Sequence, residues 1–340
     1  MDNQSADLLI IGAGLTGLML ATALVEQGDS RRILLVDKRR SVGGRLATRR
    51  LGGGRADHGA QFFTVRDKAF ENYVNKWLAA DLVFPWSVGW SNGSTDATPN
   101  DGHPRYAVRG GMNALAKYLA GALADAPNVS IATDVRIAAL TVRGDGWRAV
   151  TTDDVTLDAA TVVSTTPVPQ GLEMLDAGGV ALDEGDRAAL ARVDYAPCLC
   201  GLYVVDGVVT LPEPGAVQDP NAPITWIADN RRKGISPDAT VITVHAGPDL
   251  SRALYTAPDD EVEPLLREAL RPFLAAGSSV RAAQVKRWRY ALPVVLHPTR
   301  SLRARGLPPL YFGGDAFGGP RVEGAALSGL ALAAALTPGR

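Results

Sequence analysis

The stretch Asp7-Leu-Leu-Ile-Ile-Gly-Ala-Gly-Leu-Thr-Gly17 decides the fold of this chain. Its apolar beginning, residues 7–11, predicts a short buried strand, and the glycines that follow predict a sharp turn. Residues 18–27 are typical of a helix, which we expect to end at Gly28. A buried strand that passes through such a turn into a helix is the start of a dinucleotide-binding βαβ unit.

Each glycine of the Gly12-x-Gly14-x-x-Gly17 turn has its own task. The first allows the tight turn, the second lets a pyrophosphate approach the backbone, and the third lets the helix lie close to the strand. The phosphates then meet the free N–H groups and the positive dipole end of the helix. A second buried strand, residues 32–36, ends at Asp37, whose carboxylate can accept both ribose hydroxyls. The pattern therefore predicts an adenine dinucleotide.

The composition excludes several classes of protein. The chain has 340 residues, 46% of them hydrophobic and 21% charged, so it can build one large domain or two ordinary ones. Its 35 basic and 36 acidic residues leave a net charge of −1, which gives no support to nucleic-acid or membrane binding. Cys198 and Cys200 are the only cysteines, too close for an ordinary disulfide and too few for structural zinc. We expect no metal.

The N-terminal apolar run, residues 8–25, is interrupted by glycines, and no basic stretch precedes it. It therefore predicts neither a signal peptide nor a membrane span. We expect a soluble protein of a reducing compartment, located in the cytoplasm.

The rest of the chain predicts further elements. We expect loop or helix-start material over 43–54, a helix over 68–80, a long loop over 89–104 and a helix over 113–124. Strand-like runs at 129–133, 136–143, 146–151 and 160–164 favour an antiparallel meander that returns to the main sheet. A second, mostly antiparallel domain is expected between 167 and 282, with helices at 182–192 and 259–275 and strands at 198–206, 223–229 and 240–246. A strand over 310–315 and a helix over 322–336 close the chain.

The far end of the chain decides which dinucleotide is bound. The strand ends in Gly313-Gly-Asp315, and Val322-Glu-Gly-Ala325 opens the last helix. The aspartate can reach ribityl hydroxyls or phosphate-linked groups, and the helix start can direct N–H groups at the N1/O2 edge of a flavin. Residues 41–45, Ser-Val-Gly-Gly-Arg, extend the first cradle. NAD needs no second cradle about 300 residues downstream, so the sequence favours FAD.

Several segments carry a family resemblance. The chain resembles the FAD-dependent amine-oxidase-like flavoproteins and, within them, the bacterial members of the renalase family. The matching segments are Asp37-Lys-Arg-Arg-Ser-Val-Gly-Gly-Arg45, Ala56-Asp-His-Gly-Ala-Gln-Phe-Phe63, Thr166-Pro-Val-Pro169, Asp229-Asn-Arg-Arg-Lys233, Lys286-Arg-Trp-Arg-Tyr290 and Gly313-Gly-Asp315 with the helix that follows. They span essentially the whole chain in family order.

The resemblance implies an α/β fold of two parts. A glutathione-reductase-like FAD domain with a central parallel sheet is expected over 1–66, 104–168 and 282–340, and a mostly antiparallel α+β substrate domain over 67–103 and 169–281. It further implies noncovalent FAD, which agrees with the absence of a cysteine near Gly313. The implied reaction is oxidation of mis-reduced 1,2- or 1,6-dihydro-NAD(P): flavin N5 accepts the hydride, and O2 is reduced to hydrogen peroxide. We expect a monomer or homodimer.

The predicted site follows from the motifs and the resemblance together. Residues expected to contact FAD are Gly12, Ala13, Gly14, Leu15, Thr16, Gly17, Asp37, Lys38, Gly44, Arg45, Gln61, Phe62, Val135, Thr166, Gly314, Asp315, Val322, Glu323 and Ala325. Residues that could contact a nicotinamide are Trp226, His245, Trp288 and Tyr290, for each of which core packing is the alternative. Arg231, Arg232 and Lys233 either form a solvated loop or meet substrate phosphates.

One departure from the superfamily bears on the reaction. Amine oxidases of this type carry a lysine on a substrate-domain strand near flavin N5, and the corresponding stretch here, residues 197–203, has none. The gap suits a dihydronicotinamide, whose hydride leaves without a base, so no acid–base residue is expected. A small amine oxidase and a flavin-bound redox sensor without turnover remain the alternatives.

Overall fold

The computed structural model describes residues 4–93, 100 and 102–337. The chain forms two compact units, of which the first comprises Met1–Gly44, Ala116–Asp194 and Pro293–Arg340. The second comprises Arg45–Leu115 and Tyr195–Leu292. The predicted domains have other boundaries: residues 45–66, 104–115 and 282–292 lie in the second unit, and residues 169–194 lie in the first. How the FAD-binding and substrate roles divide along the chain stays a prediction.

The first unit is built on a parallel sheet with the strand order β17-β10-β1-β2-β7, and β16 continues it antiparallel to β17. Neighbouring strands within that order run parallel. The strands are β1 (Gln4–Ile11), β2 (Ile33–Asp37), β7 (Val129–Thr133), β10 (Thr156–Ser164), β16 (Leu302–Arg303) and β17 (Leu310–Phe312). All five residues of β2 are buried, as expected for a strand covered on both faces. The predicted parallel sheet is confirmed.

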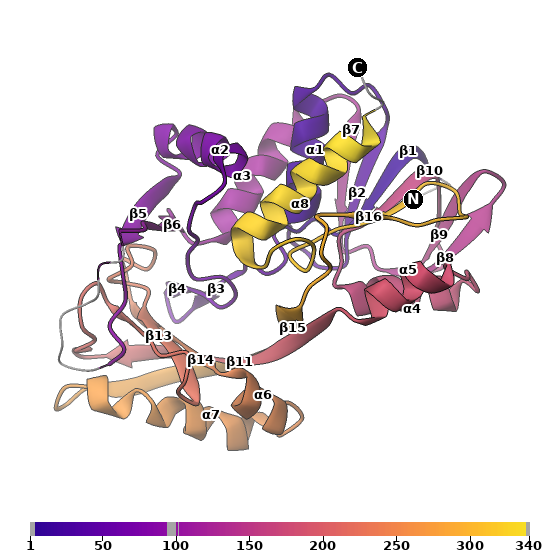
Figure 1. Cartoon of the computed structure of the whole chain (residues 1–340). Helices are drawn as coiled ribbons and strands as arrows, with labels where there is room; N and C mark the ends of the chain where they lie inside the picture. Colours follow the sequence, from indigo (N-terminus) through magenta and orange to yellow (C-terminus); the bar gives the residue numbers. More distant parts are fainter. Residues whose placement is uncertain (1–3, 94–99, 101, 338–340) are drawn as a thin grey trace. The chain divides into compact units, whose positions relative to one another are not determined.

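The helices α1 (Leu15–Glu26) and α8 (Arg321–Leu336) pack side by side in this unit (Figure 1). The Thr16 hydroxyl donates to the Ala325 carbonyl at 2.9 Å, so the two helix starts lie together. Further along, a Cβ on Gly329 would lie 2.6 Å from the Thr16 carbonyl oxygen and 2.9 Å from Met19 Cβ. The small residues that the sequence places in the last helix are thus what permits this close approach.

The remaining elements of the first unit flank the sheet. They are α3 (Asn113–Ala124), which begins in the second unit, β8 (Ile137–Arg143), β9 (Gly146–Thr151), α4 (Val168–Ala177) and α5 (Glu184–Ala191). β8 and β9 form the predicted antiparallel meander with β10, whereas β7 pairs with β2 in the parallel sheet. α4 was not predicted because Pro167 and Pro169 mark it as a loop. These prolines occupy its N-cap and second position, where no N–H is needed.

The second unit contains a five-stranded sheet in the order β12-β13-β14-β11-β15. Its strands are β11 (Asp194–Asp206), whose first residue belongs to the first unit, β12 (Ala216–Gln218), β13 (Ile224–Asp229), β14 (Thr240–Ala246) and β15 (Ser279–Val295), whose end passes into the first unit. The pairs that join β12, β13, β14 and β11 are antiparallel, as predicted. α6 (Pro248–Ala253) and α7 (Asp259–Glu268) lie along it (Figure 1), and Val262 and Leu266 of α7 are buried in its core.

Two small two-stranded sheets and one helix complete the second unit. They are β3 (Thr48–Leu51) with β4 (Gly54–Asp57), α2 (Lys68–Ala79), and β5 (Val83–Ser87) with β6 (Arg105–Val108). The sequence predicted a loop or helix start over 43–54, which was wrong for residues 48–51, since they form β3. The glycines at 52 and 53 both have positive φ and form the turn of the hairpin. The predicted loop over 89–104 lies partly outside the described residues. The predicted helix over 259–275 ends at Glu268, and a 3-10 turn η1 (Arg271–Phe273) follows around Pro272.

Within the described part of the chain, no helix combines the length and apolar character that crossing a bilayer requires.

We predict that Gly329→Ala destabilises the protein by about 1–3 kcal/mol, because the added methyl group overpacks the contact between α1 and α8. Gly121→Ala is the matched control: Gly121 lies inside α3, and no atom lies within 4 Å of a Cβ placed there. That change should raise stability by about 0.5–1 kcal/mol through helix propensity. Urea unfolding measures both; equal effects would contradict the close approach.

Candidate functional site

The glycine turn of the first unit has the geometry that a dinucleotide site needs. Gly12 has a φ of +110°, which side chains rarely adopt. A Cβ on Gly17 would lie against the Gly12 carbonyl oxygen, so the helix can approach the strand only with glycine there. A Cβ on Gly14 would meet no atom within 4 Å, which leaves open space where a pyrophosphate is expected. α1 also begins without a side-chain cap, so no side chain occupies its first N–H groups.

Asp37 ties the strand β2 to this turn. Its Oδ2 accepts from the backbone N–H of Ala13 at 2.9 Å and its Oδ1 from that of Arg39 at 2.8 Å. Its backbone carbonyl accepts from Val135 N–H at 2.9 Å, so the predicted Val135 lies beside it. A carboxylate has about four acceptor positions, so the aspartate can hold the turn and still accept hydroxyl groups.

The second cradle lies at the end of β17 and the start of α8. Gly314 has a φ of +145°, and its N–H donates to the Ser328 hydroxyl at 2.9 Å. Asp315 follows and is buried. α8 begins at its N-cap Pro320 without a side-chain cap, with Val322 and Glu323 in its first turn. Because Thr16 bonds to Ala325, the two helix starts belong to one region of the first unit.

The other predicted cofactor residues of this unit lie at its edges. Thr166 follows β10, and its hydroxyl pairs with that of Ser164 at 3.0 Å. Lys38 is exposed, and its ammonium donates to the Gln170 side chain at 2.9 Å. Gly14 and Gly43 form a short bridge, so Gly44 lies beside the turn. The structure thus brings the predicted residues of the first unit together, and their contact with cofactor stays a prediction.

The predicted cofactor residue Arg45 belongs to the second unit. Its guanidinium donates to the carbonyls of Tyr290 and Ala291, each at 3.2 Å, and lies 6.0 Å from the centre of the Tyr195 ring. The Tyr290 ring packs edge-on against that of Tyr195. Arg45 therefore belongs to one cluster with Tyr290 on β15 and Tyr195 on β11.

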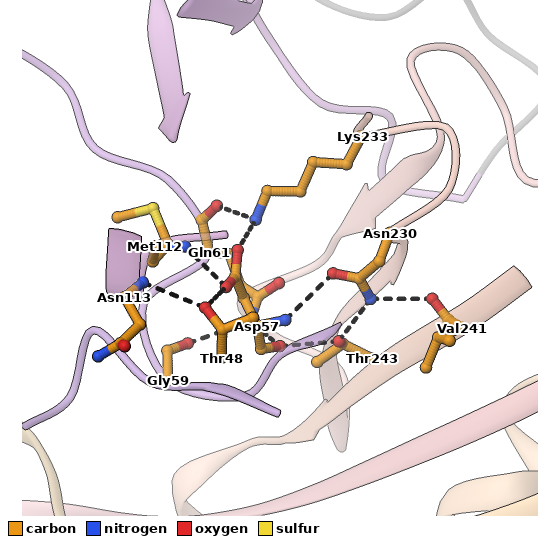
Figure 2. A network of polar contacts seen from close by, with 10 residues as sticks. All are labelled: Thr48, Asp57, Gly59, Gln61, Met112, Asn113, Asn230, Lys233, Val241 and Thr243. Atoms are coloured by element: carbon orange, nitrogen blue, oxygen red, sulfur yellow. Dashed lines mark hydrogen bonds and ion pairs between the residues drawn. The ribbon is translucent and has the colours of Figure 1, made fainter. Parts of the chain in front are cut away.

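A fully buried ion pair organises the second unit (Figure 2). Asp57 Oδ2 accepts from Lys233 Nζ at 2.6 Å, and both side chains have no exposed surface. Asp57 Oδ1 accepts from the Thr48 hydroxyl at 2.5 Å and from Met112 N–H at 2.8 Å. Burial lowers the pKa of Lys233, and the Asp57 carboxylate opposes that shift. For Lys233, the prediction of a solvated loop was wrong, because the side chain turns into the core.

The same network fixes the predicted Gln61. Its side-chain amide nitrogen donates to the backbone carbonyls of Asp57 at 2.7 Å and Gly59 at 3.1 Å. The backbone carbonyl of Gln61 accepts from Lys233 Nζ at 2.5 Å. The amide oxygen Oε1 is buried, without a partner among the described residues. Oxidised flavin carries a single ring N–H, so this orphan acceptor fits a flavin edge.

An aromatic cluster lies next to Gln61. Phe62 has ring-centre distances of 5.0 Å to Trp90 and 5.5 Å to Trp226, and the rings of Trp90 and Trp226 meet edge-on at 5.0 Å. Trp86 packs on both tryptophans, and Lys233 Nζ lies 4.9 Å from the centre of its ring. Trp226 was predicted as a candidate, whereas Trp86 and Trp90 were missed. Trp90 lies in the predicted loop over 89–104, and Trp86 lies on β5, which was not predicted.

His245 lies opposite Trp226 on the neighbouring strand β14. Burial, and next to it the positive charge of Lys233, lowers the pKa of His245 to about 4, so the imidazole is neutral near pH 7. The backbone carbonyl of His58 interacts with this imidazole and partly opposes the lowering of its pKa. That carbonyl accepts from Trp288 Nε1 at 2.6 Å, and the His58 ring stacks on Trp288 at 5.2 Å. Trp226, His245 and Trp288 thus surround the segment 58–62.

Sequence reasoning also missed the burial of Lys233. Its neighbours explain why: Arg231 is exposed, and Arg232 pairs with Glu213. Three basic residues in a row therefore predicted either a solvated loop or a contact with substrate phosphates, and neither alternative includes a buried ion pair. Two facts could have pointed to it: Asp57 is a carboxylate on a buried strand and needs a counter-charge, and the chain offers few lysines to supply one.

Comparisons with known proteins define the class. The family model for NAD(P)-binding Rossmann-like domains matches residues 10–77. The model for flavin containing amine oxidoreductases matches residues 92–337. This chain belongs to the flavin-containing amine oxidoreductase family; it is an FAD-dependent oxidoreductase, and the two cradles of the first unit fit FAD.

Solved structures share the fold. One is described as "Putative protoporphyrinogen oxidase from Exiguobacterium sp. 255-15"; it matches with a TM-score of 0.72 at 12% identity over 99% of both chains. Wild-type putrescine oxidase bound to putrescine matches with a TM-score of 0.59 at 15% identity, over 98% of this chain and 99% of that one. At these identities the likeness concerns the fold alone.

We predict that Asp37→Ala lowers FAD affinity about tenfold or more, since hydroxyl acceptors are lost and the glycine turn loses its tie to β2. Asp7→Ala is the control, because Asp7 lies in the middle of β1, before the glycine turn, and pairs with Arg32. Its FAD affinity should be unchanged. Equilibrium binding of FAD to the apoprotein measures both, and an unchanged dissociation constant for Asp37→Ala would refute the cofactor contact.

We predict that Lys233→Met destabilises the protein by about 3–5 kcal/mol, because it leaves the buried Asp57 carboxylate without its counter-charge. Adding Asp57→Asn should recover part of that loss, so the double variant is more stable than the sum of the single effects. Arg252→Ala breaks an exposed pair with Asp249 and should change stability by less than about 1 kcal/mol. Urea unfolding of the holoprotein decides: additive effects would mean that the pair is not coupled.

Proposed function

We propose that this FAD enzyme oxidises dihydro-NAD(P) isomers that carry the hydride at the wrong ring carbon, the 1,2- or 1,6-forms, to NAD(P)+. The observation that carries the proposal is the aromatic cluster of Phe62, Trp90 and Trp226 with the neutral His245 beside it. A flat, uncharged ring packs well on such a surface, and aromatic contacts orient it.

The titratable groups of this cluster also favour hydride transfer over acid–base chemistry. The ammonium of Lys233 is committed to Asp57 and to the Gln61 carbonyl. His245, with its pKa near 4, is a weak base at neutral pH. A dihydronicotinamide needs no base, because loss of hydride from carbon makes its ring aromatic. The side chains then have to orient the ring and exclude water.

The overall reaction balances with oxygen as the acceptor. Dihydro-NAD(P), O2 and one proton give NAD(P)+ and hydrogen peroxide. Bound FAD supplies the two-electron acceptor that takes up the hydride and passes the electrons on. On the protein side, Gln61 is held by the buried Asp57–Lys233 pair, and Trp288 is held by the His58 carbonyl. These contacts keep the aromatic walls in one arrangement.

Finer assignments belong to the same proposal: renalase-type membership, noncovalent FAD, a cytoplasmic location and a monomeric or dimeric state. Noncovalent binding is supported by the cysteines. Burial raises the pKa of Cys198 to about 12 and that of Cys200 well above its usual value, so both stay protonated thiols on β11.

A small amine oxidase is the second candidate, because the family carries that activity in its name and putrescine oxidase shares the fold. An amine must lose an N–H proton as it is oxidised. Residues 197–203, which correspond to the lysine-bearing strand of the family, lie on β11 and include no lysine.

Anaerobic mixing of the holoenzyme with each substrate class tests the proposal. Rapid bleaching of the flavin by 1,2- or 1,6-dihydro-NAD(P), and none by putrescine or benzylamine, is the expected result. Bleaching by amines alone would replace the proposal with the amine oxidase, and bleaching by neither class would favour a flavin-bound sensor.

We predict that the rate constant of flavin reduction at saturating dihydronicotinamide is nearly flat between about pH 6 and 8.5. The lowered pKa of His245 keeps this ring neutral throughout that window, and protonation sets in only as the pH falls toward 4. His245→Asn should weaken binding more than it slows reduction. Stopped-flow traces at several pH values measure this; a tenfold change per pH unit would show that a protein base takes part.

A further inference from the structure

Two buried polar atoms on neighbouring strands of the second unit have no hydrogen-bond partner among the described residues. They are Nε1 of Trp226 and Nε2 of His245. Trp226 on β13 and His245 on β14 are directly paired across an antiparallel register, so their side chains leave the same face of the sheet. Buried polar atoms are almost always satisfied in native proteins, so a bound group is expected to complete them.

The two atoms have complementary hydrogen-bonding character. An indole N–H only donates. A neutral imidazole has one N–H and one lone pair. Because the backbone carbonyl of His58 interacts with this ring and Nε2 has no partner, we assign the hydrogen to Nδ1. Nε2 therefore keeps a lone pair and accepts. One donor and one acceptor thus lie side by side on this face.

A third atom extends the pattern. Nε1 of Trp90 is also buried without a partner among the described residues. Its ring meets that of Trp226 edge-on at 5.0 Å. A carbonyl oxygen has two lone pairs, so it can accept from two indole N–H groups at once.

We propose that Trp226 and His245 together bind a primary carboxamide, whose oxygen accepts from the indole N–H groups and whose NH2 donates to His245 Nε2. This inference rests on the proposed function, since the nicotinamide ring carries such a group. It names the part of the ring that this face recognises. A carboxylate would place negative charge against the His245 lone pair, and an ammonium group would leave the indole donors without an acceptor, so both bind poorly here.

Product analogues test the proposal on the holoenzyme, with flavin absorbance as the signal. NAD+ has the full amide, 3-acetylpyridine adenine dinucleotide replaces NH2 by methyl, and thionicotinamide adenine dinucleotide replaces oxygen by sulfur, a weak acceptor. We expect NAD+ to bind about tenfold tighter than either analogue, because each analogue loses one hydrogen bond and leaves a buried polar atom of the protein without a partner.

Variants assign each preference to its residue. His245→Phe removes the acceptor of the amide NH2, so it should abolish the preference for NAD+ over the acetylpyridine analogue. Trp226→Phe removes a donor to the amide oxygen, so it should abolish the preference for NAD+ over the thionicotinamide analogue. Trp86→Phe is the matched control: it lies in the same cluster, but its N–H already donates to the Pro214 carbonyl at 3.4 Å. This variant should keep both preferences.

The outcomes separate this inference from the proposed function. Equal binding of the three dinucleotides by the wild type, or no binding, overturns amide recognition without recourse to any variant. So do preferences that persist in both His245→Phe and Trp226→Phe. If the preferences follow the predicted pattern but no dihydro isomer bleaches the flavin, the carboxamide site stands and the proposed oxidation is wrong.

Discussion

The buried carboxylate of Asp57 is the constraint on which the second unit depends. It collects a hydroxyl from Thr48, a backbone N–H from Met112 and the ammonium of Lys233, all inside the protein (Figure 2). Its backbone carbonyl accepts from Gln61 and from the hydroxyl of Thr243 on β14. Segments from across the sequence are thus held at one point, and these contacts position the 57–62 segment that carries Gln61 and Phe62.

In the first unit, the glycines bring the starts of the helices α1 and α8 together. Glycine at 12 and 17 lets α1 leave β1 sharply, and glycine at 329 lets α8 lie against α1. Both helices begin without a side-chain cap, so their N-terminal N–H groups are left for a ligand. This arrangement explains why FAD, a cofactor with phosphates at its centre, fits a chain whose cradles are about 300 residues apart in sequence.

Local patterns predicted much of the fold, because the turn from Gly12 to Gly17 and the position of Asp37 follow from short-range sterics. The contact of these residues with FAD stays a prediction. Three features were not predicted, since glycines and prolines there resemble loop signals. They are the hairpin of β3 and β4, the helix α4 and the two-stranded sheet of β5 and β6. The burial of Lys233 and Trp90 was not predicted for a different reason. Their burial depends on partners far away in sequence, and Lys233 stands beside two arginines that do reach solvent or the surface.

The central claim is that the substrate loses a hydride from a ring carbon without help from a protein base. The most direct measurement is the anaerobic rate of flavin reduction by 1,2- and 1,6-dihydro-NAD(P) with deuterium at the carbon that holds the transferred hydrogen. The account predicts a severalfold slower reduction with the labelled carbon and no change when deuterium replaces hydrogen at other ring positions. Reduction at the same rate with and without the label, or reduction by amines alone, would contradict it.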